Sequence, residues 1–156
     1  MELKGREKQI VGERIKKIDR LREEGVEPYA HSFELEEKRV FSADVKEKFS
    51  KLKDEEISGK KAVVAGRVMT KRSFGKLSFF SLQDLRGTIQ VVVQARNSVP
   101  SKLGTGVPDS SGKGRVPEEV VEMFKKTDAG DIVGVKGEVV KTRTGEVSIM
   151  AQEIFI

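Results

Sequence analysis

The chain has 156 residues, of which 30 are Lys or Arg and 25 are Asp or Glu, giving a net charge of +5. This length suits either one ordinary domain or a small domain with an appendage, and is too short for a two-domain enzyme. The chain contains no cysteine and a single histidine, His31, which excludes disulfides and argues against a Ser-His-Asp triad or a multi-histidine metal site. No apolar run approaches a membrane span, and the first residues lack a secretory signal. We expect a soluble, cytoplasmic protein whose slightly basic charge permits a polyanionic partner.

A helix is expected over residues 9–24, where Gly25 is well placed to end it. Its apolar stripe is narrow and consists of Ile10, Ile15, Ile18 and Leu21. The other faces carry basic side chains, including Arg14 and Lys17. These are either a solvated surface or a basic arm that makes phosphate contacts with a nucleic acid.

A second helix is expected over residues 42–56, with Ser42 as its cap. Its apolar face consists of Val45, Phe49 and Leu52. After residue 58 the pattern changes from helical to strand-like. We therefore divide the chain into a helical extension, residues 1–57, and a β domain, residues 58–156.

The β domain has five segments rich in Val, Ile, Phe and Thr, bounded by short turns that contain glycine. They are residues 61–72, 77–84, 88–94, 131–142 and 146–156. Between the third and fourth lie a Gly/Ser-rich stretch, residues 97–115, expected to be a disordered loop, and a short helix, residues 117–126. Three strands, a helix and two strands is the order of a five-stranded, mainly β, OB-fold Greek-key barrel.

Alternation along the strands predicts which side chains face outward. Phe80 and Leu82 share one face of their strand and are expected in the core, which places Phe79 outside. The same reasoning places Gln90 on the outer face of the next strand. An exposed aromatic ring beside an amide can stack on an unpaired base and bond its edge, although a surface Phe and Gln also occur together by chance.

Several charged residues surround this face. Arg67, Lys71 and Arg72 in the first strand, and Lys141 and Arg143 near the last turn, are candidates for phosphate contacts. Parity alone leaves the direction of Arg72 open. Glu146 can accept a hydrogen bond from a base, but a carboxylate repels phosphate, and from the pattern alone a turn-flanking charge is the better explanation.

The stretches AGRVMTKRSFGKLSFFSLQD from Ala65, GTIQVVVQ from Gly87, LREEGVEPYAHSF from Leu21 and KTRTGEVSIMA from Lys141 resemble the N-terminal anticodon-binding domain of class II lysyl-tRNA synthetases. The resemblance runs from about Arg14 to the end, interrupted by the Gly/Ser-rich stretch. It implies that Arg72, Phe79, Gln90 and Glu146 grip the middle uridine of a lysine anticodon.

The resemblance also implies a parent enzyme, a homodimer, that activates lysine with ATP and Mg²⁺ and transfers it to tRNA. None of the family's catalytic segments is found here, so we expect no catalytic residue, no metal and no cofactor in this chain, which would bind tRNA as a monomer without turnover. Two alternatives stay open: the aspartyl or asparaginyl branch, which shares the barrel, and a generic OB module for single-stranded nucleic acid. A small-molecule enzyme is the least supported.

Overall fold

The computed structural model describes residues 5–29, 38–75, 77–94 and 118–156. The chain divides into two compact units, Met1–Glu34 and Leu35–Ile156. The division expected from the sequence, 1–57 and 58–156, differs by assigning residues 35–57 to the extension. No helix in the described ranges is long and apolar enough to cross a membrane.

The described part of the first unit, residues 5–29, contains the helix α1 (Arg6–Glu23), followed by Gly25 with a φ of 79°. The helix starts three residues before the expected position, and Arg20 and Arg22 in its last turn suit the negative end of the helix dipole. Its apolar stripe is exposed toward the start of the helix and buried toward its end: Ile10 and Ile15 each expose 52% of their surface, whereas Leu21 exposes 3%.

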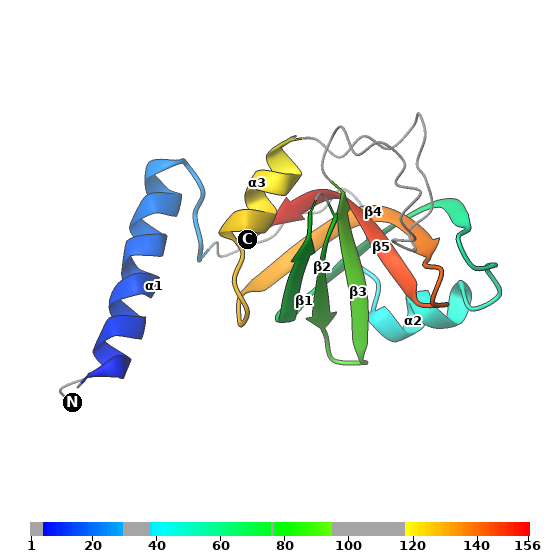
Figure 1. The fold of residues 1–156 in the computed structure, drawn as a ribbon, viewed down its shortest axis with the longest axis horizontal. Coiled ribbons are helices and arrows are strands. Elements are labelled where there is room, and N and C mark those ends of the chain that lie inside the picture. Colours follow the sequence, from blue (N-terminus) through cyan, green and yellow to red (C-terminus); the bar gives the residue numbers. More distant parts are fainter. Residues whose placement is uncertain (1–4, 30–37, 76, 95–117) are drawn as a thin grey trace. The chain divides into compact units, whose positions relative to one another are not determined.

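The second unit is a closed five-stranded barrel, as the sequence predicts (Figure 1). Its strands are β1 (Ile57–Phe74), β2 (Leu77–Gln83), β3 (Thr88–Gln94), β4 (Ile132–Lys141) and β5 (Val147–Phe155). The order around the barrel is β1-β2-β3-β5-β4. All neighbours are antiparallel except β3 and β5, which pair in parallel. The long strand β1 pairs with both β2 and β4, and this double pairing closes the ring.

Alternating side chains fill the barrel interior. Phe80, Leu82, Ile89 and Val91 are each at most 2% exposed, which confirms the expected core positions of Phe80 and Leu82. Helix α3 (Glu118–Lys126) packs Val120 and Phe124 into the same core. The ring centroids of Phe124 and Phe80 lie 5.8 Å apart. The expected helix between the third and fourth strands is therefore confirmed, while the loop at residues 97–115 lies outside the described residues.

Close packing in the barrel depends on two glycines, Gly66 on β1 and Gly137 on β4. A Cβ atom at Gly137 would overlap the backbone carbonyl of Met150 on β5, and one at Gly66 would overlap that of Gln83. Strands can approach this closely only where no side chain intervenes.

The helix expected over residues 42–56 is shorter than predicted. Helix α2 comprises Ser42–Lys48, and β1 already begins at Ile57. The intervening residues form turns, and Glu55 has a φ of 64°. The apolar pattern misled because Phe49 and Leu52 do pack against the core, but from turns instead of from a continuing helix.

Candidate nucleic-acid interface

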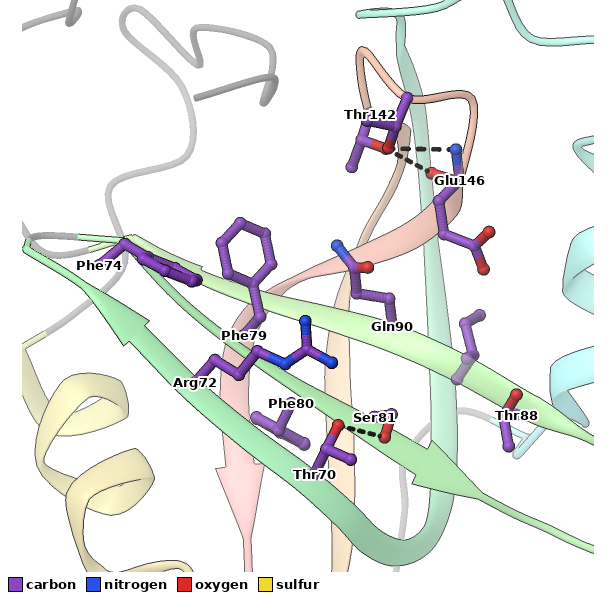
Figure 2. Close-up of a pocket in the computed structure, with 12 residues that line it drawn as sticks. Thr70, Arg72, Phe74, Phe79, Phe80, Ser81, Thr88, Gln90, Thr142 and Glu146 are labelled. Carbon is purple, nitrogen blue, oxygen red and sulfur yellow. Dashed lines mark hydrogen bonds between the residues drawn. The ribbon is translucent and has the colours of Figure 1, made fainter. Parts of the chain in front are cut away.

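A pocket of about 470 Å³ opens on the outer face of the barrel. Strands β1, β2 and β3 and the turn between β4 and β5 form its walls, as Figure 2 shows. Its lining consists of Thr70, Arg72, Phe74, Phe79, Phe80, Ser81, Thr88, Ile89, Gln90, Thr142, Thr144 and Glu146. All four residues assigned to the anticodon by resemblance are therefore brought to one pocket.

A β-bulge determines that Arg72 faces this pocket. Along β1, Val68 pairs with Leu82 and points into the core, but the next pair is Thr70 with Ser81, so the register shifts at Met69. Without the shift, Thr70 and Arg72 would follow the inward parity of Val68. With it, Arg72 lies opposite Phe79 on the outer face. The question that parity left open is thus decided by one extra residue.

Apart from the buried Phe80, the pocket is lined by two aromatic rings instead of the single ring that the sequence indicates. Phe79 is half-buried, and Phe74 is 64% exposed, with the ring centroids 6.4 Å apart in an edge-to-face arrangement. Figure 2 shows the Phe79 ring, the Arg72 guanidinium and the Gln90 amide projecting on the same side of the sheet. Strand alternation does not single out Phe74, which ends β1 beside the turn to β2. An exposed Phe beside the turn glycine was the signal that could have identified it.

Glu146 lies on the other side of Gln90 from Phe79 (Figure 2). Its backbone N–H donates to Thr142 Oγ1 at 3.2 Å, and its carbonyl accepts from the Thr142 N–H at 3.0 Å. The carboxylate is paired with Lys46 of α2, with Nζ 2.7 Å from Oε1. Sequence patterns did not single out Lys46, because nothing local relates a residue of α2 to a turn between two strands.

Asp84, at the end of β2, connects the turn between β2 and β3 to the start of α2. Its carboxylate accepts from the Ser42 N–H at 2.6 Å and the Ser42 hydroxyl at 2.9 Å, and from the N–H groups of Arg86 and Gly87 at 2.8 and 3.0 Å. Burial would raise the pKa of Asp84, but these four hydrogen bonds to the charged form outweigh it and hold the pKa below its usual value.

Two of the basic candidates, Lys71 and Lys141, each donate to more than one backbone carbonyl. Lys71 Nζ donates to the carbonyls of Phe124 and Thr127, both at 2.7 Å, and so caps the end of α3. Lys141 Nζ donates to the carbonyls of Ser50 and Leu52 at 3.2 and 3.0 Å. These contacts favour a role in stability for both lysines over phosphate binding.

The remaining basic candidates lie in different places. Arg143 is exposed on the turn between β4 and β5, next to pocket residues Thr142 and Thr144. Arg67 is exposed on β1 and donates to the Gly130 carbonyl at 2.8 Å. Arg14 and Lys17 belong to α1 in the other compact unit. Of these two arginines of the second unit, Arg143 and Arg67, the first adjoins the pocket directly.

The chemistry of the pocket is that of recognition. Its side chains offer an aromatic face, a guanidinium donor, an amide and a carboxylate, the set that reads an unpaired base by stacking and by its edge. Within the described ranges, no group of three or more His, Cys, Asp or Glu side chains is arranged to hold a metal ion.

Comparison with known families agrees with this fold and pocket. Residues 62–156 match the family model described as the OB-fold nucleic acid binding domain. The chain belongs to this family of nucleic-acid-binding domains.

More particularly, the chain is homologous to the N-terminal region of lysine–tRNA ligases. It is 39% identical over 150 residues to the lysine–tRNA ligase of Streptococcus pneumoniae (strain Hungary19A-6), covering 95% of this chain and 26% of that protein. The lysine–tRNA ligase of Syntrophomonas wolfei subsp. wolfei is 34% identical over 142 residues, covering 91% of this chain and 24% of that protein. The chain thus spans about a quarter of the length of the curated relatives it matches.

Proposed function

We propose that this domain binds the anticodon stem-loop of a lysine-accepting tRNA and reads its middle uridine. The observation that carries the proposal is the convergence of Arg72, Phe79 and Gln90, from three adjacent strands, on one pocket. The relationship to lysine–tRNA ligases supports the same assignment.

The donor and acceptor pattern of the pocket suits uracil. Uracil presents two carbonyl acceptors flanking one N–H donor, whereas cytosine presents an amino donor beside a ring acceptor. Arg72 can donate to a carbonyl, and the Gln90 amide can donate and accept at once. Phe79 supplies the stacking surface, and Glu146 supplies a further acceptor for an N–H group. Stacking gives affinity to any base, so discrimination depends on the polar groups.

Arg143 is proposed as a phosphate contact because it is exposed beside the pocket, and Arg14, Lys17 and Arg67 remain proposals of the same kind. The domain is proposed to act within a larger lysine–tRNA ligase of the cytoplasm, a homodimer that uses ATP and Mg²⁺ to charge tRNA. The 156 residues would contribute binding without turnover, and lysine-dependent pyrophosphate exchange by this chain alone would contradict that part.

The test compares two RNA stem-loops at one fixed salt concentration: one with a lysine anticodon and one with its middle uridine changed to cytidine. The wild-type chain is expected to prefer uridine. Phe79→Ala is expected to lose about 1 to 3 kcal/mol of binding to the uridine loop because it removes the stacked ring. Leu85→Ala is the matched control, since Leu85 is 91% exposed and is not part of the pocket lining.

The outcomes separate the alternatives. Equal binding of both loops by the wild type and by Phe79→Ala would leave a generic single-strand OB module. A uridine preference combined with tighter binding to aspartate or asparagine stem-loops would indicate the other synthetase branches, which share the middle uridine and differ at the flanking bases. Circular dichroism of each variant excludes loss of fold as the cause.

A further inference from the structure

Helix α2 is bound to two turns of the barrel, one of which, the turn between β4 and β5, forms a wall of the pocket. At its start, the Ser42 N–H and hydroxyl donate to Asp84, and Asp44 pairs with Arg86 at 2.7 Å, so this end is tied to the turn between β2 and β3. One turn further along, Lys46 pairs with Glu146 at 2.7 Å in the turn between β4 and β5. The helix therefore spans the two turns and fixes each relative to the barrel.

The ion pair with Lys46 orients the side chain of Glu146, which the hydrogen bonds of its own turn do not fix. The backbone of Glu146 is held by two hydrogen bonds with Thr142. Its side chain is 43% exposed and that of Lys46 is 38% exposed, so neither is confined by close packing. The contact with Lys46 selects one orientation of the carboxylate among those available to an exposed side chain.

The pair also resolves the electrostatic difficulty that Glu146 presents. An unpaired carboxylate in a nucleic-acid site repels the phosphates of its ligand, and an adjacent ammonium group offsets that charge. A carboxylate has two oxygens with several acceptor positions. Engagement of Oε1 by Lys46 therefore leaves acceptor capacity for a base N–H group.

We propose that Lys46 is a positioning residue that determines base specificity: it holds the Glu146 carboxylate in the orientation that accepts from the bound base and neutralises its charge toward the RNA backbone. This inference rests on the proposed function. It separates Lys46 from the phosphate contacts, since Lys46 acts through Glu146 and not on the ligand.

The experiment measures the ratio of affinities for the uridine and cytidine stem-loops. Lys46→Met removes the charge and keeps the length of the side chain, and is expected to reduce the ratio about threefold, within the range for a half-exposed ion pair. Lys46→Arg is expected to retain most of the ratio. In a Glu146→Gln background, Lys46→Met is expected to change the ratio no further, because the group through which it acts is gone. Lys51→Met, an exposed lysine shortly after α2, is the control and should leave the ratio unchanged.

A direct phosphate contact predicts a different result. Lys46→Met would then weaken both loops equally, keep the ratio and reduce the slope of log affinity against log salt by about one; this result overturns the inference. An equal loss of ratio in the wild-type and Glu146→Gln backgrounds overturns it too.

Failure of the inference is distinguishable from failure of the proposed function. If the wild type prefers uridine and Phe79→Ala loses binding, but Lys46→Met keeps the full ratio, only the role of Lys46 falls. If the wild type shows no preference, the proposed function falls and takes the inference with it. Thermal unfolding of Lys46→Met close to that of the wild type shows that the variant is folded.

Discussion

The carboxylate of Asp84 offers a quantitative test of how α2 is held on the barrel. Replacing it by Asp84→Asn preserves the shape of the side chain. An amide oxygen in the place of Oδ1 can still accept from the Ser42 hydroxyl and from Arg86 and Gly87. In the wild type, the Ser42 N–H donates to Oδ2 at 2.6 Å. In the variant, the amide nitrogen takes the place of Oδ2 and faces this N–H, so that two donors oppose each other.

The expected cost follows from that one contact. A hydrogen bond to a charged group contributes about 1.5 to 3 kcal/mol, and partial access of water to Asp84 places the loss near the lower half of this range. We expect Asp84→Asn to lower the free energy of unfolding by about 2 kcal/mol at pH 7. For a unit of this size, that corresponds to a midpoint about 8 °C lower.

The pH dependence follows from the lowered pKa of Asp84. The unfolded chain takes up a proton at this carboxyl near pH 4, while the folded protein still holds it ionised. The stabilisation is therefore fully present above the unfolded pKa and is lost as the pH falls through the folded pKa. The difference between wild type and Asp84→Asn should be full at pH 7 and should shrink below about pH 4.

The assay is thermal unfolding by circular dichroism between pH 2.5 and pH 7, with Glu47→Gln as the control. Glu47 is an exposed carboxylate on the same helix, and its substitution should change stability by less than about 0.5 kcal/mol. A difference between wild type and Asp84→Asn that stays constant across this pH range would refute the reasoning, as would a difference no larger than that of the control.

Two further substitutions test the packing and the basic residues. Gly137→Ala should destabilise the barrel by about 3 kcal/mol or more, because the added Cβ overlaps the Met150 carbonyl. Gly12 in α1 has open space around it, so the control Gly12→Ala should leave the unfolding midpoint of the barrel unchanged. Lys71→Met should lower the free energy of unfolding by about 1 to 2 kcal/mol, because the cap of α3 is lost. The affinity for the stem-loop and its salt dependence should stay unchanged. Weaker RNA binding with unchanged stability would instead indicate that Lys71 contacts phosphate.

The regular parts of the barrel followed from local pattern. In β2 and β3 the period of two placed Phe80 and Leu82 inside and left Phe79 on the outer face, because side chains of a regular strand must alternate. The order of the elements predicted the OB fold because local periodicity identified each segment as a strand or a helix. Few arrangements fit three strands, a helix and two strands. The resemblance supplied Glu146, whose proposed role no periodicity indicates.

Tertiary structure decided what depends on irregular or distant contacts. The bulge at Met69 turned Arg72 toward the pocket, and a register shift leaves no reliable mark in a strand-like sequence. Lys71 and Lys141 look like surface cations in the sequence, but their ammonium groups meet backbone carbonyls that are distant along the chain. The pairing of Lys46 with Glu146 arises in the same way. Local pattern predicts which face of a strand or helix a residue occupies. Its hydrogen-bond and ion-pair partners depend on how the barrel closes and on where α2 lies.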